Sequence, residues 1–141
     1  MPDEPTLPVP PLSESPELAR HFDGLRAGVL LLPRCDACTV VIWYPRAFCP
    51  SCGSAAVTWF EACGRGTVYS FTIVRKGIGL FADHTPYVVA YVELDEGPRV
   101  LTNIVGPPEE VAIGVEVAAR YELDADGTPI LRFQLSPAGA V

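Results

Sequence analysis

Four cysteines in two Cys-x-x-Cys pairs are the residues of this chain with the clearest chemistry. The pairs are Cys35/Cys38 and Cys49/Cys52, and ten residues separate them. Zinc prefers four tetrahedral ligands, and two such turns supply four thiolates to one ion. Because four protein ligands leave no position for water or substrate, we expect a structural zinc ion rather than a catalytic one.

Two disulfide bonds are the alternative for the same cysteines. Disulfides are typical of secreted proteins, whereas the N-terminal sequence MPDEPTLPVPPLSESPE has neither the basic start nor the apolar centre of a signal peptide. No apolar run in the sequence reaches the roughly 20 residues that a membrane span requires. We therefore expect a cytoplasmic protein whose thiols hold zinc.

The residues around the pairs predict a zinc ribbon over residues 30–59. Gly53 directly follows the second pair and can adopt the positive φ that a tight turn requires. The intervening run VVIWY, at residues 40–44, is β-branched and aromatic. Such composition favours a short strand between the two cysteine turns.

A short helix is expected before the ribbon, over residues 15–29. Ser15 is a good N-cap, Pro16 suits the first helical position, and Gly28 is a natural C-cap. Its apolar face would consist of Leu18, Phe22, Leu25 and Val29. This face packs on the chain's own ribbon or barrel, or it lines a ligand groove or docks on another subunit. The proline-rich residues 1–14 are expected to form a flexible arm, with docking as an extended strap as the alternative.

Residues 60–141 have an alternating pattern that predicts five strands. The expected strands cover residues 67–74, 87–94, 100–105, 115–123 and 130–135. One face of the first strand would carry Thr67, Tyr69, Phe71 and Ile73. The last strand would place Arg132 and Gln134 opposite Leu131, Phe133 and Leu135. Five strands with a helical turn between the third and fourth fit an OB-type Greek-key barrel, and a plain β-sandwich is the alternative.

The fifth cysteine, Cys63, lies outside both pairs near the entry to the first of these strands. No histidine is near it in sequence, and His84 could approach it only through the fold. A catalytic thiol needs an adjacent base. We therefore expect Cys63 to be a small buried residue rather than a nucleophile.

The charge of the chain argues against nucleic-acid binding. The net charge is −7 with a pI of about 4.7, and Lys76 is the only lysine. No basic cluster exceeds the pair Arg75–Lys76. Binding to nucleic acid relies on clustered Lys and Arg that neutralise phosphates. The sequence lacks that pattern.

The order of helix, four-cysteine ribbon and five strands resembles the zinc-ribbon/OB-fold proteins associated with acyl-CoA enzymes, first catalogued as a domain of unknown function. The stretches that carry the resemblance are FDGLRAG, LLPRC, FCPSCGS, GRGTVYSFTIV, PYVVAYVELDEG, RVLTNIVG and IGVEV. The resemblance implies a mainly β fold with an N-terminal helix, a rubredoxin-like zinc ribbon and a five-stranded OB-fold barrel. One departure is the pair His21–Phe22, where the family often has Phe-Trp.

The resemblance also implies a function. Members of this family are accessory subunits of thiolase-fold enzymes, or domains fused to acyl-CoA hydratases. This implies a role in thiolysis, ketoacyl-CoA condensation or retro-aldol cleavage of an acyl-CoA, with the catalytic residues on the thiolase-fold partner. The present chain would brace that partner in a hetero-oligomer and help to line its CoA site.

Residues that could contact CoA or the partner gather around the first barrel strand. The candidates are Arg65, Arg75, Lys76, Leu80, Phe81 and His84. Arginine makes bidentate contacts to phosphates, and Arg34 and Arg46 flank the ribbon as well. The loop at residues 76–86 is long and apolar at its tip, which is unfavourable in water unless the loop covers something. The alternatives are a loop folded over its own barrel and arginines that are solvated surface charges.

Three functions therefore compete. The first is an accessory subunit of a thiolase-like acyl-CoA enzyme. The second is a nucleic-acid-binding OB module, against which the acidity argues. The third is a self-sufficient enzyme, for which the sequence offers no open metal site, phosphate-binding loop or clear acid–base pair.

Overall fold

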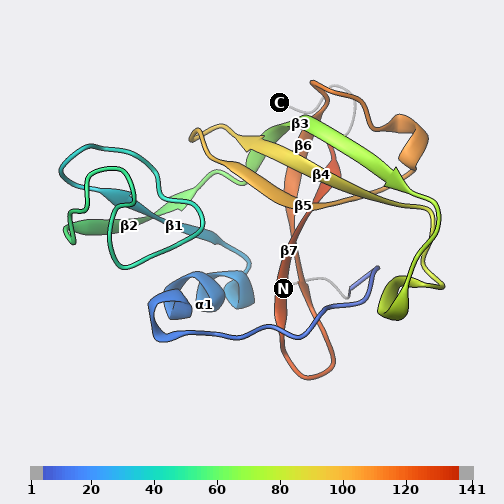
Figure 1. The fold of residues 1–141 in the computed structure, drawn as a ribbon, viewed down its shortest axis with the longest axis horizontal. Helices are drawn as coiled ribbons and strands as arrows, with labels where there is room; N and C mark the ends of the chain where they lie inside the picture. Colours follow the sequence, from blue (N-terminus) through green and yellow to red (C-terminus); the bar gives the residue numbers. More distant parts are fainter. Residues whose placement is uncertain (1–4, 137–141) are drawn as a thin grey trace.

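The computed structural model describes residues 5–136. Figure 1 shows a zinc-ribbon lobe on one side, a barrel on the other, and the helix α1 below the junction between them. Among the described residues, no helix has the length and apolar character needed to cross a lipid bilayer.

The N-terminal helix begins as a 3-10 turn at Pro16–Leu18 (η1) and continues as α1 (Ala19–Ala27). The Ser15 side chain makes no cap hydrogen bond, but its carbonyl accepts from Leu18 N–H at 2.9 Å. Gly28 ends the helix with a φ of 78°. Leu18, Phe22 and Leu25 are buried as expected. Val29 was wrongly expected on the same face, because it follows the left-handed Gly28 and lies outside the helix.

The ribbon is built on two antiparallel strands, β1 (Leu30–Cys35) and β2 (Val57–Ala62), with Cys35 opposite Val57. The strand expected at residues 40–44 is wrong, since only Val41 forms a single bridge to Arg34. Proline provides the reason. On the edge of β1 that faces Val41, the Pro33 carbonyl accepts a hydrogen bond from Ile42 N–H at 2.8 Å. Pro33 has no N–H to donate to Ile42, so the ladder of hydrogen bonds stops there.

Five strands form a closed barrel, which confirms the OB-type fold over the sandwich. They are β3 (Arg65–Val74), β4 (Tyr87–Leu94), β5 (Arg99–Val105), β6 (Glu116–Leu123) and β7 (Pro129–Leu135). They close in the order β3-β4-β5-β7-β6, and the turn η3 (Pro108–Glu110) links β5 to β6. A second short turn, η2 (Gly79–Phe81), lies between β3 and β4.

A β-bulge in β3 breaks the expected alternation of its side chains. The register against β4 shifts between Val68 and Ser70. Tyr69 is therefore 48% exposed, whereas Phe71 and Ile73 pack against the core. The single face expected for these residues is wrong, because one extra residue transfers the following side chains to the other face.

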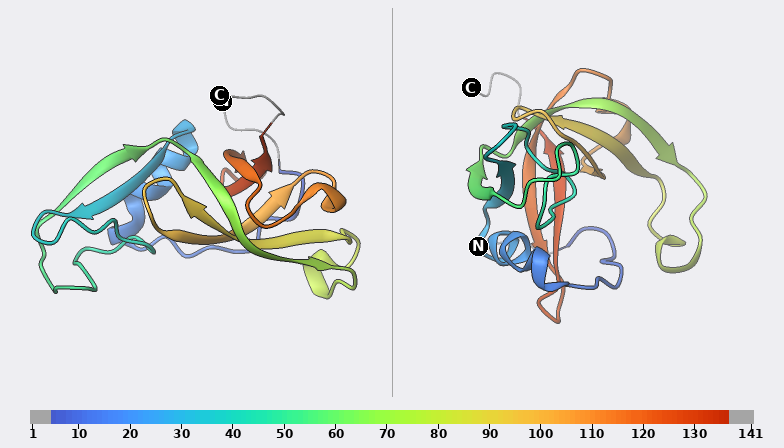
Figure 2. Two further views of the ribbon diagram at one scale, coloured as in Figure 1. Left: turned by 90° about the horizontal axis from the view of Figure 1, so that it is seen from above. Right: turned by 60° about the vertical axis from the view of Figure 1, so that its left-hand side comes forward.

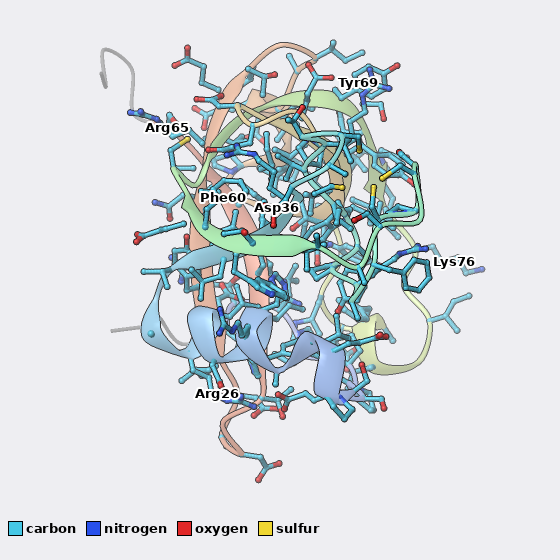
Figure 3. All side chains as sticks on the ribbon, turned by 90° about the vertical axis from the view of Figure 1, so that its left-hand side faces the viewer. Arg26, Asp36, Phe60, Arg65, Tyr69 and Lys76 are labelled. Atoms are coloured by element: carbon cyan, nitrogen blue, oxygen red, sulfur yellow. The ribbon has the colours of Figure 1, made fainter. Side chains whose placement is uncertain are left out.

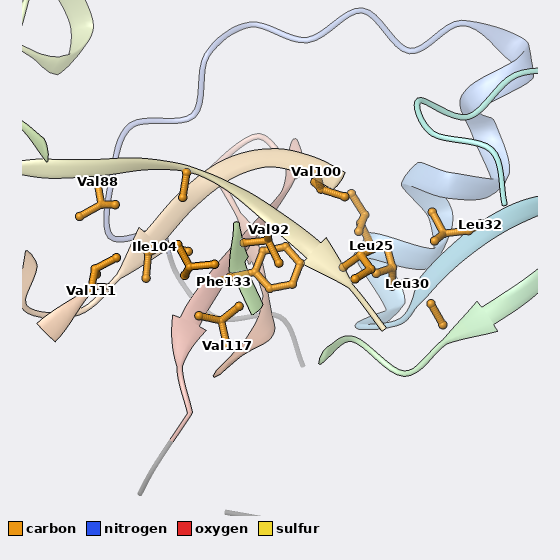
Figure 4. Close-up of a cluster of buried hydrophobic side chains, with 14 of the residues drawn as sticks. Leu25, Leu30, Leu32, Val88, Val92, Val100, Ile104, Val111, Val117 and Phe133 are labelled. Atoms are coloured by element: carbon orange, nitrogen blue, oxygen red, sulfur yellow. The ribbon is translucent and has the colours of Figure 1, made fainter. Parts of the chain in front are cut away.

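One hydrophobic core joins the helix, β1 and the barrel. Leu25 and Leu30 belong to the same buried cluster as Val92, Val117 and Phe133 (Figure 4). The cysteine end of the ribbon has its own small cluster of Cys35, Ile42 and Cys49. Because β2 continues to Ala62 and β3 begins at Arg65, the ribbon passes directly into the barrel. The division of the chain at residues 14, 29 and 59 stays a prediction.

Residues 5–14 form no regular secondary structure and run across β7 to the helix (Figure 1). The Arg132 guanidinium donates to the carbonyls of Leu7 at 3.0 Å and Pro8 at 2.7 Å. Arg132 is thus fully buried, although the alternation of β7 placed it on the polar face. The flexibility of the arm stays a prediction.

Candidate functional site

The four paired cysteines converge at one end of the ribbon. Their sulfur atoms all lie within 4.8 Å of one another. Cys35 Sγ is 3.5 Å from Cys52 Sγ, and Cys38 Sγ is 3.6 Å from Cys49 Sγ. A tetrahedral zinc ion with bonds of 2.3 Å to sulfur separates its ligands by about 3.8 Å. The arrangement therefore fits one zinc ion held by four thiolates, with no open coordination position.

The two cysteine turns share one backbone pattern. Thr39 N–H donates to Cys35 O at 2.9 Å, and Gly53 N–H donates to Cys49 O at 2.8 Å. Both closing residues are left-handed, with φ of 67° for Thr39 and 79° for Gly53. The sequence predicted this conformation for Gly53 and missed it for Thr39. Thr39 and Gly53 each lie four residues after the first cysteine of their pair, and this equal spacing could have indicated the same conformation for both.

Backbone N–H groups favour the thiolate forms of the two buried cysteines. Cys38 N–H donates to Cys35 Sγ at 3.4 Å and lowers the pKa of Cys35. Burial opposes ionisation of Cys49, but N–H groups of Cys52 and Ser51 outweigh it and lower the pKa of Cys49 to about 7. For Cys38 a backbone N–H at Val40 lowers the pKa, but desolvation and the bond to Cys49 raise it to about 12, and the pKa of Cys52 is raised as well, so zinc binding must release those two protons.

Most of the predicted CoA or partner contacts lie together at the far end of the β3–β4 hairpin. Arg75, Lys76 and His84 are exposed there. Leu80 is 56% exposed, whereas the Phe81 ring packs 5.1 Å from the ring of Tyr87. The sequence missed Ile78, which is 87% exposed and therefore the more prominent apolar residue of this loop.

Arg65 does not join this group. It begins β3, whereas Arg75 and Lys76 follow the other end of that strand. Figure 2 shows the ribbon and the β3–β4 loop at opposite ends of the molecule, and Figure 3 shows Arg65 and Lys76 well apart. The candidate contacts thus form two separate groups.

Cys63 differs from its expectation, because it is exposed rather than buried. It occupies the turn between β2 and β3, where its N–H donates to Glu96 Oε2 at 2.9 Å. Partial burial, together with the Glu96 carboxylate, raises the pKa of its thiol. The fold does not bring it to His84, because the register places Gly66 and Tyr87 at opposite ends of the β3–β4 pair.

A groove of about 360 Å³ lies between the helix, the ribbon and the barrel, and a groove lined by the helix face was one of the alternatives that the sequence left open. Phe22 of α1, Trp43 of the ribbon and Leu131 of β7 contribute to its walls. The residues of the other two walls are far apart in sequence, so no local pattern could have shown which of them face the helix.

The sequence matches two family profiles that together cover the ribbon and most of the barrel. Residues 22–58 match the profile described as "ChsH2, rubredoxin-like zinc ribbon domain". Residues 59–122 match "ChsH2, C-terminal OB-fold domain". The two profiles follow the same order as the lobes of the structure.

Relatives extend this similarity. A "DUF35 domain-containing scaffold protein" of Pyrococcus furiosus is 37% identical over 97 residues, which cover 65% of this chain and 71% of the relative. "Benzoylsuccinyl-CoA thiolase subunit BbsA" of Thauera aromatica is 29% identical over 89% of this chain and 83% of its own length. A Thermomonospora curvata protein named "Probable enoyl-CoA hydratase alpha subunit" is 42% identical over 74% of this chain, which spans 33% of its length.

A solved structure agrees with these matches. The structure "Ltp2-ChsH2(DUF35) aldolase" contains a chain that superposes with a TM-score of 0.78 at 32% identity. The superposition covers 89% of this chain and 98% of that one.

Proposed function

Since the chain belongs to the DUF35 family of zinc-ribbon/OB-fold proteins that includes ChsH2, we propose that it is an accessory subunit of an acyl-CoA enzyme. Its partner is a thiolase-fold subunit that carries the catalytic residues. The reaction is thiolysis, condensation or retro-aldol cleavage of an acyl-CoA.

One observation carries this proposal. The chain superposes on almost the whole of one chain of the Ltp2-ChsH2(DUF35) aldolase. The name of the Thauera aromatica relative supports it, since that protein is a subunit of a thiolase. A chain that matches 98% of one such chain and 83% of the other is best explained as a subunit of the same kind.

The chemistry of the chain is consistent with a supporting role. Four cysteine ligands would complete the coordination of zinc, so the metal stabilises the ribbon and is closed to substrate. Cys63 has a raised pKa and no histidine partner, so it does not supply a nucleophile.

The decisive experiment is reconstitution with the thiolase-fold protein that copurifies from the native host. The isolated chain should not turn over acyl-CoA, and its addition to the partner should restore turnover. Turnover by the chain alone, or full activity of the partner without it, would contradict the proposal.

The β3–β4 loop is the proposed contact with the partner. Ile78 and Leu80 are exposed apolar residues, and burying each on association is worth about 1.5 kcal/mol or more. The double variant Ile78→Asp, Leu80→Asp should weaken the complex at least tenfold in a binding titration. Phe81 is left unchanged because its ring packs on Tyr87. Ile113→Asp is the matched control, since Ile113 is 72% exposed on another loop.

The basic residues test the proposed CoA contact. Arg75→Ala or Lys76→Ala should raise KM for the acyl-CoA more than it lowers kcat, because a phosphate contact is equal in the ground and transition states. Arg65→Ala makes the same test at the opposite end of β3. An unchanged KM in all three variants would exclude these residues as phosphate ligands.

A further inference from the structure

The groove between the helix, the ribbon and the barrel has apolar walls and no charged side chain among its lining residues. Phe22 and Leu25 come from α1, Trp43 and Tyr44 from the ribbon, and Leu101 and Leu131 from the barrel. A volume of about 360 Å³ is within the range of small-molecule sites. An uncharged lining disfavours an ionic group inside the groove, because nothing there would compensate a buried charge.

Most polar groups in the groove already have partners within the protein. Thr102 Oγ1 donates to Leu131 O at 3.2 Å. Asn103 donates to Val88 O at 2.9 Å and accepts from Arg132 Nε at 3.2 Å. These residues therefore shape the barrel wall and have little capacity left for a ligand.

His21 keeps a ring nitrogen that is not used in this way. It lines the groove and is only 2% exposed, and its Nδ1–H donates to the Leu31 carbonyl at 3.1 Å. That bond fixes the tautomer and leaves Nε2 as an acceptor with no partner among residues 5–136. Burial lowers the pKa of His21, with the Leu31 bond acting against it, so the imidazole is neutral at pH 7.

Trp43 adds a hydrogen-bond donor to the wall of the same groove. Its ring centroid lies 5.5 Å from that of His21, and its indole N–H has no partner among the described residues. A hydroxyl group both donates and accepts, so it can pair with an imidazole acceptor or with an indole donor of this groove. Neither nitrogen is enclosed by protein, since Glu96 Oε1 is the buried unpartnered side-chain atom of the described residues, so a ligand hydroxyl can reach both and replace water there.

We propose that this groove binds a neutral, mainly apolar molecule or acyl group that carries one hydroxyl. The hydroxyl donates to His21 Nε2 and the apolar body lies between Phe22, Trp43 and Leu131. His21 therefore determines specificity for a hydroxylated ligand over its apolar analogue. The proposal concerns this chain alone and does not depend on a partner subunit.

The test compares 1-decanol with decyl methyl ether, which has the same apolar body and no donor. Zinc-loaded protein is titrated, and binding is followed by NMR at the His21 ring nitrogens and the Trp43 indole N–H. The alcohol should bind about tenfold more tightly than the ether, because only the alcohol donates to His21 Nε2. It should also shift the His21 Nε2 resonance more than the ether does.

Two variants separate the hydrogen bond from the apolar surface. His21→Phe keeps a ring and removes the acceptor, so it should bind both probes with equal affinity. Leu101→Trp should obstruct the groove and weaken both probes, and Ile113→Trp, on a distant exposed loop, should bind as the unmodified chain does. Absence of saturable binding, equal affinity of the unmodified chain for both probes, or a preference that survives in His21→Phe would overturn the proposal.

A second pair of probes identifies the source of the ligand. A His21-dependent preference for 3-hydroxydecanoyl-CoA over decanoyl-CoA would assign the groove to the acyl part of a thioester. Binding of the free alcohol alone would assign it to a free hydroxylated molecule. Both results would support a ligand site in the groove, and neither measurement requires a complex with the thiolase-fold subunit.

Discussion

The cysteine sulfurs are the residues on which the ribbon depends most directly. Their separations of 3.5 and 3.6 Å are those of ligands around one tetrahedral ion. The strands β1 and β2 bring the chain to this point but bury only a small cluster beside it, so the metal supplies much of the stability of that end.

Cys38→Ser should therefore abolish stoichiometric zinc binding and disrupt the ribbon. Metal analysis of the purified chain should give about one zinc per chain, and the variant should give less. Cys63→Ser is the matched control, because Cys63 lies outside the sulfur cluster and should leave the zinc content unchanged. A zinc-free chain with five free thiols and an intact fold would contradict the assignment.

The residues that close the two cysteine turns, Thr39 and Gly53, allow a second prediction. Thr39 and Gly53 both have left-handed backbones, which cost a side-chain-bearing residue about 1–2 kcal/mol. Gly53→Ala should thus lower the free energy of unfolding by about 1 kcal/mol, although the space around Gly53 is open. Thr39→Gly should leave it unchanged or raise it by up to about 1 kcal/mol, measured by thermal unfolding of zinc-loaded protein. An unchanged free energy of unfolding in Gly53→Ala would contradict this prediction and show that the turn adjusts freely.

At the scale of elements, a buried ion pair joins β6, β7 and the arm. Arg132 Nη1 donates to Glu122 Oε1 at 2.6 Å, and Glu122 Oε2 accepts from Arg120 at 2.6 Å. The arm covers this pair through the Leu7 and Pro8 carbonyls. Such pairs are costly to break because the remaining charge is left without compensation.

Arg132→Met should lower the free energy of unfolding by about 3 kcal/mol and make residues 5–14 sensitive to protease, because the arm loses its donor. Denaturant unfolding and limited proteolysis measure the two effects. Arg99→Met is the control, since the Arg99–Glu93 pair is exposed and should contribute at most about 1 kcal/mol. Equal losses in both variants would mean that the buried network has no special role.

At the scale of the whole molecule, the charge distribution argues against nucleic-acid binding by the OB barrel. Tyr69 and Tyr91 on the barrel are 48% and 45% exposed. Exposed aromatic rings of this kind form the stacking surface for bases in OB folds that bind single-stranded nucleic acid. The cation beside them, Arg99, lies 3.7 Å above the Tyr69 ring and is paired with Glu93 at 3.0 Å. With a net charge of −7, this face offers little neutralisation of phosphates.

The chain should therefore bind single-stranded DNA or RNA no better than an acidic control protein. Fluorescence anisotropy with labelled oligonucleotides at low and high salt measures this. Micromolar binding that weakens steeply with added salt would restore the nucleic-acid hypothesis.

The sequence alone determined the features that depend on local spacing. These features are the two cysteine pairs, the turn glycines Gly28 and Gly53, and the alternating pattern of the barrel strands. Each depends only on residues that are close together in the chain. Their order predicted the helix, the ribbon and the barrel. Local sterics and metal geometry constrain such features within a few residues.

Tertiary structure alone decided the features that depend on distant neighbours. Arg132 is buried because the arm crosses β7, 124 residues away in sequence. Tyr69 is turned outward by the register against β4, and Cys63 is exposed because its turn lies at the junction of the two lobes. His21 faces Trp43 only because the helix packs beside the ribbon. Burial is a property of all the elements that meet at a point, so no single stretch of sequence specifies it.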